Sequence, residues 1–306
     1  MTELASSPIG VVPIVWNNAD VAGLAPRVPA LMVLDEAARL GFDGVQDGIG
    51  FPRGSALHLA LTERGLRLAE VYVALPCGPD GLEPDALGLG RRRLAELDQA
   101  GGEVLVVALS FTPERQALAG RAADGQAHTL SDPAWSELAS VLETLGAEAR
   151  ALGHPLAFHG HAGTFVETPD ELDRLARATD PGLVGLCLDV GHYLVGGGDP
   201  VAAVRRFRSR VVHVHLKDVA PEPLARLRAG TIPGFVDALR ARIFTELGSG
   251  ILDLAGVLGA LADAGYQGWL MVEQDTSWKP PSESAAIGRS VLGFALRLRA
   301  EGRRAA

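Results

Sequence analysis

Two apolar stretches in the middle of the chain, residues 183–188 and 211–216, run directly into ionisable side chains. These side chains are Asp189 and His192 after the first stretch, and His213, His215 and Lys217 in and after the second. Short apolar runs bounded by turn residues are typical of parallel strands buried on both faces. In α/β folds, ligands bind at the C-terminal ends of such strands. The pattern therefore predicts that carboxylate and imidazole groups from two neighbouring strands meet in one cleft.

Further polar and aromatic side chains lie within or after other predicted strands. They are Trp16, Asn17, Gln46, Asp47, Glu70, Tyr72, His159, His161 and Glu273. Together with the first group they form a mixed set of nitrogen and oxygen donors. Imidazole and carboxylate without thiolate suit a divalent cation such as Mn, Co, Zn or Mg. Because the chain has no dedicated phosphate-binding loop, we expect a small polar organic molecule as the ligand.

The position of each residue along its strand distinguishes a predicted ligand from a residue of the core. Side chains repeat with period two along a strand, so His213 and His215 lie on the same side. His215 stands nearer the strand end and is the predicted ligand, whereas His213 could be a deeper, hydrogen-bonded core histidine. Glu273 follows the apolar residues 270–272. A carboxylate at the mouth of an apolar strand is costly unless it is paired or metal-bound, so Glu273 is also a predicted ligand.

Several of these residues also have ordinary structural interpretations. Asp189 could cap a helix or stabilise a turn. Lys217 could belong to a solvated turn, and Trp16 could either pack in the core or stack on the C–H face of a sugar ring. Four residues at early strand ends could be ordinary capping residues, namely Gln46, Asp47, Glu70 and Tyr72. The residue types alone leave these alternatives open.

Eight apolar runs alternate with eight helical patterns along the chain. The predicted strands are 9–16, 42–47, 66–75, 104–109, 156–158, 183–188, 211–216 and 269–272. The predicted helices are 28–39, 56–64, 85–99, 133–152, 169–177, 200–207, 254–264 and 284–301. Strict alternation indicates a parallel sheet closed into a (β/α)8 TIM barrel, in which the C-terminal strand ends converge on one face.

The chain is predicted to form one domain. No linker rich in Pro, Gly and Ser divides it, so we expect a single barrel over residues 1–306 with short flexible ends at 1–7 and 302–306. The segments 111–131 and 219–250 interrupt the alternation and are predicted long loops. Long loops in compact domains are often functional, so we expect these two to cover the cleft and influence specificity.

The composition excludes several classes of protein. The net charge of −9 disfavours a nucleic-acid partner, since affinity for the phosphate backbone comes from clustered Lys and Arg. Two cysteines, Cys77 and Cys187, cannot build a disulfide framework and indicate reduced thiols. The N-terminus has no signal-peptide pattern, and no apolar run approaches the ~18 residues that span a bilayer. We therefore expect a cytoplasmic protein without a membrane partner.

Short motifs at several strand ends resemble those of the sugar phosphate isomerase and epimerase superfamily, whose members have a xylose isomerase-like barrel. Three of these motifs are residues 188–192, 213–218 and 268–275. Within the superfamily, Pro13-Ile-Val-Trp-Asn-Asn18 and His159-Gly-His-Ala-Gly-Thr164 resemble the inosose dehydratase branch, which removes water from a keto-inositol. The resemblance extends from the first predicted strand to the eighth.

The resemblance implies one divalent cation, held by Glu, Asp, His and Glu residues from the fifth to the eighth strands. Asp189, His215 and Glu273 match the last three ligands. At the first position the isomerases have Glu followed by Asn-His, whereas this chain has His159-Gly160-His161. His159 is then either the fourth ligand or a residue behind the ligands, and His161 is the histidine that meets the substrate.

The same resemblance implies an acid and a base. Isomerases and epimerases of the superfamily use the first and last Glu as an acid–base pair, of which this chain retains Glu273. A dehydratase needs a base for the proton beside the carbonyl and an acid for the departing hydroxyl, and His or Lys can be that acid. We expect Glu273 to be the base, and His161, His192 and Lys217 to position the substrate or supply the acid. Both reactions begin with proton abstraction next to a carbonyl.

The broader expectation is a metal-dependent isomerase or epimerase that acts on a keto-sugar or related polyol. An inosose dehydratase, which is a lyase, is the alternative, and a carbohydrate-binding barrel without catalytic activity is a further one. The predicted substrate contacts are Trp16, Asn17, Gln46, Glu70, Tyr72 and His213. Barrels of this kind frequently dimerise, so we also expect a homodimer.

Overall fold

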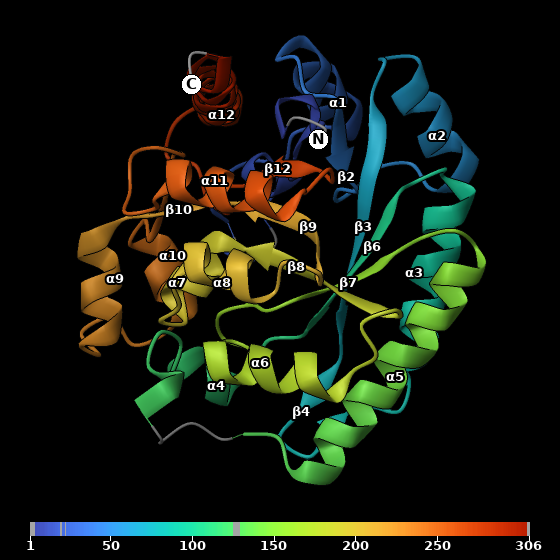
Figure 1. The fold of residues 1–306 in the computed structure, drawn as a ribbon, viewed down its shortest axis with the longest axis vertical. Helices are drawn as coiled ribbons and strands as arrows, with labels where there is room; N and C mark the ends of the chain where they lie inside the picture. The colour runs from blue at the N-terminus through green and yellow to red at the C-terminus, as the bar shows by residue number, and fades with distance from the viewer. Residues whose placement is uncertain (1–3, 19, 22, 125–128, 305–306) are drawn as a thin grey trace.

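The computed structural model describes residues 4–18, 20–21, 23–124 and 129–304, and eight parallel strands form a closed barrel (Figure 1). Around the barrel lie β1 (Ile9–Val11), β12 (Leu270–Val272), β9 (Val211–Leu216), β8 (Val184–Asp189), β7 (Leu156–His159), β6 (Val104–Leu109), β3 (Arg67–Leu75) and β2 (Gly44–Gln46). The predicted (β/α)8 TIM barrel is therefore confirmed.

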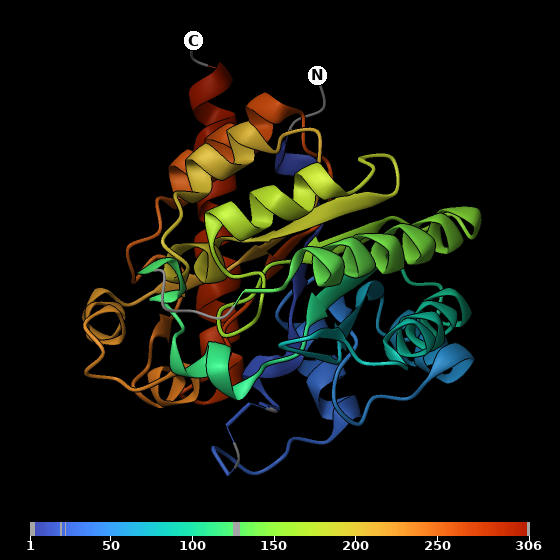
Figure 2. The ribbon, with the colours of Figure 1, turned by 90° about the horizontal axis from the view of Figure 1, so that it is seen from below.

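Each barrel strand is followed by a helix that covers the outside of the sheet (Figure 1). In chain order these are α1 (Ala30–Arg39), α2 (Gly54–Thr62), α3 (Ala86–Gln99), α5 (Asp132–Ala151), α6 (Pro169–Ala178), α8 (Pro200–Arg206), α11 (Leu254–Ala264) and α12 (Pro281–Arg304). Figure 2 shows α5 and α6 lying side by side across the barrel. The start of α6 is fixed by a capping box, in which the Thr168 side chain accepts from the Glu171 backbone N–H and the Glu171 side chain returns to that of Thr168.

The strands are buried because helices cover one face and the barrel interior covers the other. All six residues of β6 and all six of β8 are buried, as their continuous apolar patterns predict. The two cysteines, Cys77 and Cys187, are buried free thiols. Such a core holds the strand ends rigidly, which is what a site built across several strands requires.

Two elements near the site are shorter or additional compared with the prediction. The first strand ends at Val11 rather than at Trp16, because Pro13 has no N–H for the ladder and begins a 3-10 turn over Pro13–Val15. After β8, a short helix α7 (Val190–Val195) was not predicted, since six residues are too few to show helical periodicity. A small hairpin, β4 (Cys77–Gly78) with β5 (Gly81–Leu82), was also missed.

The two predicted long loops contain secondary structure of their own. The segment 111–131 includes α4 (Pro113–Ala117) and a 3-10 turn (Ala122–Asp124), while residues 125–128 lie outside the described part of the chain. The segment 219–250 contains α9 (Pro221–Arg228), α10 (Phe235–Arg240) and the antiparallel pair of β10 (Asp218–Val219) with β11 (Phe244–Thr245). They are therefore small packed units rather than irregular loops.

The second of these units is closed at its base by one carboxylate. Asp218 is fully buried, and its side chain accepts hydrogen bonds from the backbone N–H groups of Val219, Gly248, Gly250 and Leu252. These bonds hold the beginning and the end of the unit together next to the strand that carries His215.

Helical turns extend into the described parts of both predicted flexible ends. Leu4–Ser6 forms a 3-10 turn in which Leu4 is buried, and α12 packs against it and continues to Arg304. The remaining positions of the predicted flexible ends, residues 1–3, 305 and 306, lie outside the described residues. Among the helices of the described chain, none has the length and apolar character needed to cross a membrane.

A glycine in the middle of α5 gives a test of the helix–barrel packing. A Cβ at Gly146 would collide with the backbone carbonyl oxygen of Leu183, just before β8. Helix propensity alone favours Ala over Gly by about 1 kcal/mol, whereas overpacking costs about 1–3 kcal/mol. We expect Gly146→Ala to lower the free energy of unfolding, measured in urea. The control is Gly259→Ala in α11, where a Cβ meets only the Arg299 guanidinium at 3.4 Å; equal effects of both substitutions would contradict this packing.

Candidate active site

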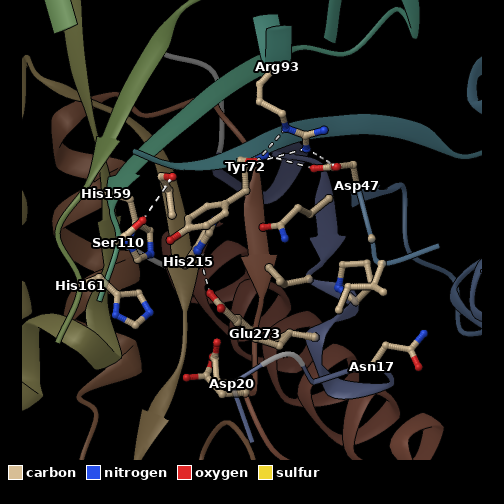
Figure 3. Close-up of a pocket in the computed structure, with 18 of the residues that line it drawn as sticks. Asn17, Asp20, Asp47, Tyr72, Arg93, Ser110, His159, His161, His215 and Glu273 are labelled. Carbon is tan, nitrogen blue, oxygen red and sulfur yellow. Dashed lines mark hydrogen bonds and ion pairs between the residues drawn. The ribbon is translucent and has the colours of Figure 1, made fainter. Parts of the chain in front are cut away.

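A cavity of about 550 Å³ opens where the C-terminal ends of the strands converge (Figure 3). Side chains from β2, β3, β6, β7 and β9 line it, together with the segments that follow β1, β2 and β12. The predicted site residues in its wall are Asn17, Gln46, Asp47, Tyr72, His159, His161, His215 and Glu273. Residues separated by up to 256 positions in the sequence, from Asn17 to Glu273, thus face one space.

Four predicted ligands lie together at the C-terminal ends of the strands, and three of them, His159, His215 and Glu273, line the cavity. His159, Asp189, His215 and Glu273 each offer one donor atom, and the four atoms lie within 4.8 Å of one another. They come from four strands that are adjacent in the barrel, β7, β8, β9 and the end of β12. His215 Nδ1 lies 2.7 Å from Glu273 Oε2 and 3.7 Å from Asp189 Oδ2. The barrel therefore assembles a compact group of two imidazoles and two carboxylates.

Three of these donor atoms are buried and make no hydrogen bond to any residue in the described ranges. They are Asp189 Oδ2, His215 Nδ1 and Glu273 Oε2. Buried polar atoms in folded proteins nearly always have a partner, so atoms that converge without one point to a missing ligand. Imidazole nitrogen and carboxylate oxygen are donors that divalent cations accept. The donor set therefore fits a divalent cation.

Asp189 is held in place by the helix that it begins. Its Oδ1 accepts a hydrogen bond from the His192 backbone N–H at 2.7 Å, which caps α7 and leaves Oδ2 toward the cluster. Burial by itself would raise the pKa of Asp189, but the nearby Lys217 charge holds this pKa well below its usual range. The capping interpretation from the sequence is therefore correct, and the same carboxylate stays ionised beside the other donors.

Lys217 is fully buried beside the cluster and does not belong to a solvated turn. Its Nζ lies 2.5 Å from Asp275, 3.0 Å from Glu273 and 3.4 Å from Asp189. Burial would lower the pKa of Lys217, but these carboxylates raise it above its ordinary value, so the ammonium persists. The described cavity wall includes Asp275 and Glu273 but not Lys217. Lys217 therefore reaches the cavity only through these two carboxylates.

Two further histidines stack next to the cluster. The rings of His161 and His192 lie 3.5 Å apart between centroids, and His161 lines the cavity whereas His192 does not. Burial lowers the pKa of both imidazoles well below the ordinary value, and neighbouring positive groups lower it further, so both rings are neutral. His192 lies 2.8 Å from Lys217 Nζ. The structure therefore places His161, not His192, where it can meet a substrate.

Glu70 and His213 do not have the positions predicted for substrate contacts. Glu70 is fully buried within β3, and its carboxylate contacts both His213 and His215 from inside the barrel. Neither Glu70 nor His213 is part of the described cavity wall. The reason is that Glu70 pairs with Val104, the first residue of β6, and therefore lies deeper in the barrel than Tyr72, which is two residues further along β3 and does line the cavity. The core interpretation of His213 is correct.

The predictions for the first strand end also need correction. Trp16 is buried in the core and donates its indole N–H to Glu36 at 2.5 Å, so it does not line the cavity. Asn17 does line the cavity, but its amide group is bound to the backbone N–H and carbonyl of Val28, both at 2.9 Å. Asn17 therefore fixes the loop after β1, and its side-chain amide is occupied by the backbone.

Several residues in the wall were not among the predicted site residues. They are Asp20, Arg53, Arg93, Ser110, Phe111 and Asp275. Asp275 lies two residues after Glu273, and its position beyond a strand end was a usable indication. Arg93 reaches the cavity from α3 and pairs with Asp47, while the other Asp47 oxygen accepts from the Tyr72 backbone N–H at 3.1 Å (Figure 3). No strand-end pattern could reveal a side chain that comes from a helix.

Comparison with known families agrees with this geometry. A family model described as a xylose isomerase-like TIM barrel matches residues 34–292. The chain belongs to this family. The match covers the barrel from α1 to α12 and includes all four residues of the candidate cluster. The resemblance to xylose isomerase-like barrels that the strand-end motifs indicated is confirmed.

The chain is also similar to named proteins and to solved structures. A Clostridium botulinum (strain Alaska E43 / Type E3) protein named inosose dehydratase is 32% identical over 289 residues, which is 93% of this chain and 95% of that protein. The structure of an L-ribulose 3-epimerase has a TM-score of 0.73 at 18% identity, with 98% of both chains covered. The IOLI protein, whose structure contains a zinc atom, has a TM-score of 0.69 at 14% identity, with 94% of this chain and 98% of that chain covered. The two structural likenesses concern the fold alone.

Proposed function

We propose that this protein is an inosose dehydratase, a lyase that removes water from a keto-inositol. The observation that carries the proposal is the 32% identity to a protein of that name over 93% of the chain, combined with the cluster of two imidazoles and two carboxylates beside the cavity. The broader expectation of an isomerase or epimerase receives support at the level of the fold, from the L-ribulose 3-epimerase structure. The dehydratase proposal has the more specific support, because it rests on sequence identity along nearly the whole chain.

In this proposal His159, Asp189, His215 and Glu273 hold a divalent cation. The three buried donor atoms without hydrogen bonds support this assignment, and so does the zinc atom in the related IOLI structure. A divalent cation at this place supplies positive charge that stabilises negative charge developing on the substrate's carbonyl oxygen. The candidate cations are Mn, Co, Zn and Mg; carboxylate oxygens suit Mn and Mg, whereas imidazole nitrogens suit Zn.

Glu273 is the proposed base. It is the one member of the cluster that combines a carboxylate with a position in the cavity wall, since Asp189 lies outside the wall. Lys217 Nζ lies 3.0 Å from Glu273 Oε1 and holds the carboxylate in the wall, where it can take the proton next to the carbonyl. Loss of that proton and of the neighbouring hydroxyl forms the new C=C bond and releases water.

The departing hydroxyl needs a proton from an acid, which must be a different group from the base Glu273. Lys217 is the buried proton source, and its route to the cavity runs through Asp275, which lies 2.5 Å from Nζ and lines the wall. His161 also lines the wall; its Nδ1 lies 2.8 Å from the Ala162 carbonyl oxygen, so Nε2 is left for a substrate hydroxyl. We therefore assign the acid to the pair of Lys217 and Asp275, and a positioning role to His161.

The cavity favours a neutral ring over a phosphorylated sugar. Its volume of about 550 Å³ is in the range of sites that enclose one small molecule. Within the described ranges, two basic side chains line the cavity, Arg53 and Arg93. Each of them forms ion pairs with Asp47 and with Glu96. A phosphate group would have to break these ion pairs in order to bind either guanidinium group. A keto-inositol carries only hydroxyl and carbonyl groups, so it can bind while both Arg side chains stay paired.

The test is direct turnover of a keto-inositol. We expect the purified protein, loaded with Mn²⁺ or Co²⁺, to produce an unsaturated diketone that absorbs in the ultraviolet, and Asp189→Asn to abolish the absorbance change. Deuterium exchange without loss of water, seen by NMR in D₂O, would instead support an epimerase. Binding of the ring with neither exchange nor water loss would support a carbohydrate-binding barrel, and either result would contradict the dehydratase.

A further inference from the structure

A buried carboxylate lies inside the barrel beneath the cluster. Glu70 sits in β3 with no exposed surface, and its partners, His213 and His215, come from β9 across the barrel. His213 and His215 are two positions apart and therefore point to the same side of their strand. One carboxylate thus receives two imidazoles, and no part of this trio belongs to the cavity wall except His215.

The two nitrogens of His215 have different partners. Nε2 lies 2.9 and 3.1 Å from the two Glu70 oxygens, which is hydrogen-bond distance to either. Nδ1, on the other side of the ring, lies 2.7 Å from Glu273 Oε2 and has no hydrogen bond within the described chain. A proton on Nε2 leaves the Nδ1 lone pair free. The orientation of the ring toward the cluster is therefore coupled to the carboxylate behind it.

The carboxylate of Glu70 has no exposed surface and contacts the imidazoles of both His215 and His213 in the interior. Burying an ion pair contributes little net stability compared with apolar residues of the same volume. A carboxylate at this place is therefore better explained by the group that it orients than by the stability of the barrel.

We propose that Glu70 is a positioning residue: its carboxylate accepts the Nε2–H of His215 and so fixes the ring and its tautomer, with Nδ1 directed at the cation of the proposed function. This inference rests on that function because it concerns the same site. Histidines that bind metals commonly donate their second N–H to a carboxylate, and loss of that partner typically weakens metal affinity 10–100-fold. His213 supports Glu70 from the neighbouring position on β9.

The same trio could also be considered as a cation site of its own, since Glu70, His213 and His215 offer three donor atoms close together. The hydrogen bond between His215 Nε2 and Glu70 argues against this, because it already occupies the His215 nitrogen and the Glu70 carboxylate that such a site would need. Glu70 and His213 also have no exposed surface and lie outside the described cavity wall.

The experiment is Co²⁺ titration by calorimetry at fixed pH. We expect Glu70→Gln to weaken Co²⁺ binding about 10–100-fold relative to the wild type. Glu70→Asp keeps the charge but withdraws it by one methylene, so it should weaken binding in the same direction. The matched control is Glu171→Gln, another buried carboxylate, which pairs with Arg115 away from the cavity and should leave Co²⁺ affinity unchanged. Circular dichroism verifies that each variant is folded.

A second readout follows His215 itself. In the zinc-loaded wild type, nitrogen-15 NMR should show a metal-bound Nδ1 and a strongly downfield Nε2–H, assigned by its loss in His215→Gln. In Glu70→Gln that proton should move upfield, because the carboxylate acceptor is gone. A purely structural role for Glu70 would leave both signals in place.

The outcomes separate the two proposals. Equal Co²⁺ affinity in the wild type and in Glu70→Gln, with no binding to Asp189→Asn, would overturn the role of Glu70 and leave the cation site intact. Failure of the wild type to bind any cation would overturn the proposed function and, with it, this role of Glu70. Weaker binding in both Glu70 variants, together with the NMR shift, is the result we expect.

Discussion

Glu273→Gln is expected to lower kcat for keto-inositol dehydration by about 10²–10⁴-fold, the usual contribution of a positioned acid or base. Gln has nearly the same shape but cannot take a proton. Glu273 lines the cavity, and its Oε1 lies 3.0 Å from Lys217, so the substitution also leaves one charge of Lys217 without its partner. The loss should appear in kcat more than in KM, since the shape of the cavity is preserved.

Two measurements make that result specific. Metal content, measured on the same preparation, distinguishes a lost base from a lost ligand, because Glu273 belongs to both groups in the proposal. Glu246→Gln is the control: this carboxylate is paired with Lys279 at 3.2 Å and lies outside the cavity wall, so kcat should be unchanged. A fully metal-loaded Glu273→Gln with wild-type kcat would require a different base.

Lys217→Met is expected to lower the free energy of unfolding of the metal-free protein by about 3–5 kcal/mol at pH 7, since it removes one partner of a buried charge cluster. Met has a similar length and fits an apolar environment. The carboxylates of Asp189, Glu273 and Asp275 would then face one another without the ammonium that lies within 3.4 Å of each. Urea unfolding, followed by fluorescence and circular dichroism, measures the loss.

The chain offers a matched control, because it contains only one other lysine, Lys279. That side chain is 45% exposed and pairs with Glu246, and an exposed pair of this kind contributes about 0–1 kcal/mol. Lys279→Met should therefore have little effect. Similar losses in both variants would mean that the buried carboxylates do not depend on Lys217 for compensation.

The fold could be predicted from the sequence because its elements carry strong local patterns. β6 was predicted at its observed bounds, Val104–Leu109, since all of its positions are apolar and buried. α11 was predicted at Leu254–Ala264, where Asp253 caps the start and Gly265 ends the helix in a left-handed conformation. α7 and β10 were missed because elements of six and two residues carry no period.

The cluster was predictable for a related reason. His159, Asp189 and Glu273 stand at the ends of parallel strands, and closing the barrel brings such ends together whatever the intervening loops contain. Glu70 was misplaced although its strand was predicted almost at its observed bounds, because the depth of a residue in the barrel depends on how its strand pairs with the neighbouring strand. In the structure Glu70 pairs with Val104, the first residue of β6, which places it below the strand ends.

Contacts that long side chains make between different elements could not be predicted from the sequence. Arg93 belongs to α3, yet its guanidinium crosses to Asp47 after β2 and to the carbonyl oxygen of Tyr72. Helical periodicity identifies which face of α3 packs inward, but not how far a side chain extends from it. Recognising this part of the wall required the positions of three elements relative to one another.

The carboxylate of Asp218 has a consequence for how the protein could change during evolution. The Asp218 carboxylate accepts hydrogen bonds from both ends of the unit that contains α9 and α10. These bonds attach the base of that unit to the barrel. Phe235 of this unit packs against the rings of His161 and His192. Sequence changes in residues 221–240 would therefore act on the site through that contact, while Asp218 holds the base of the unit in place beside His215 and Lys217.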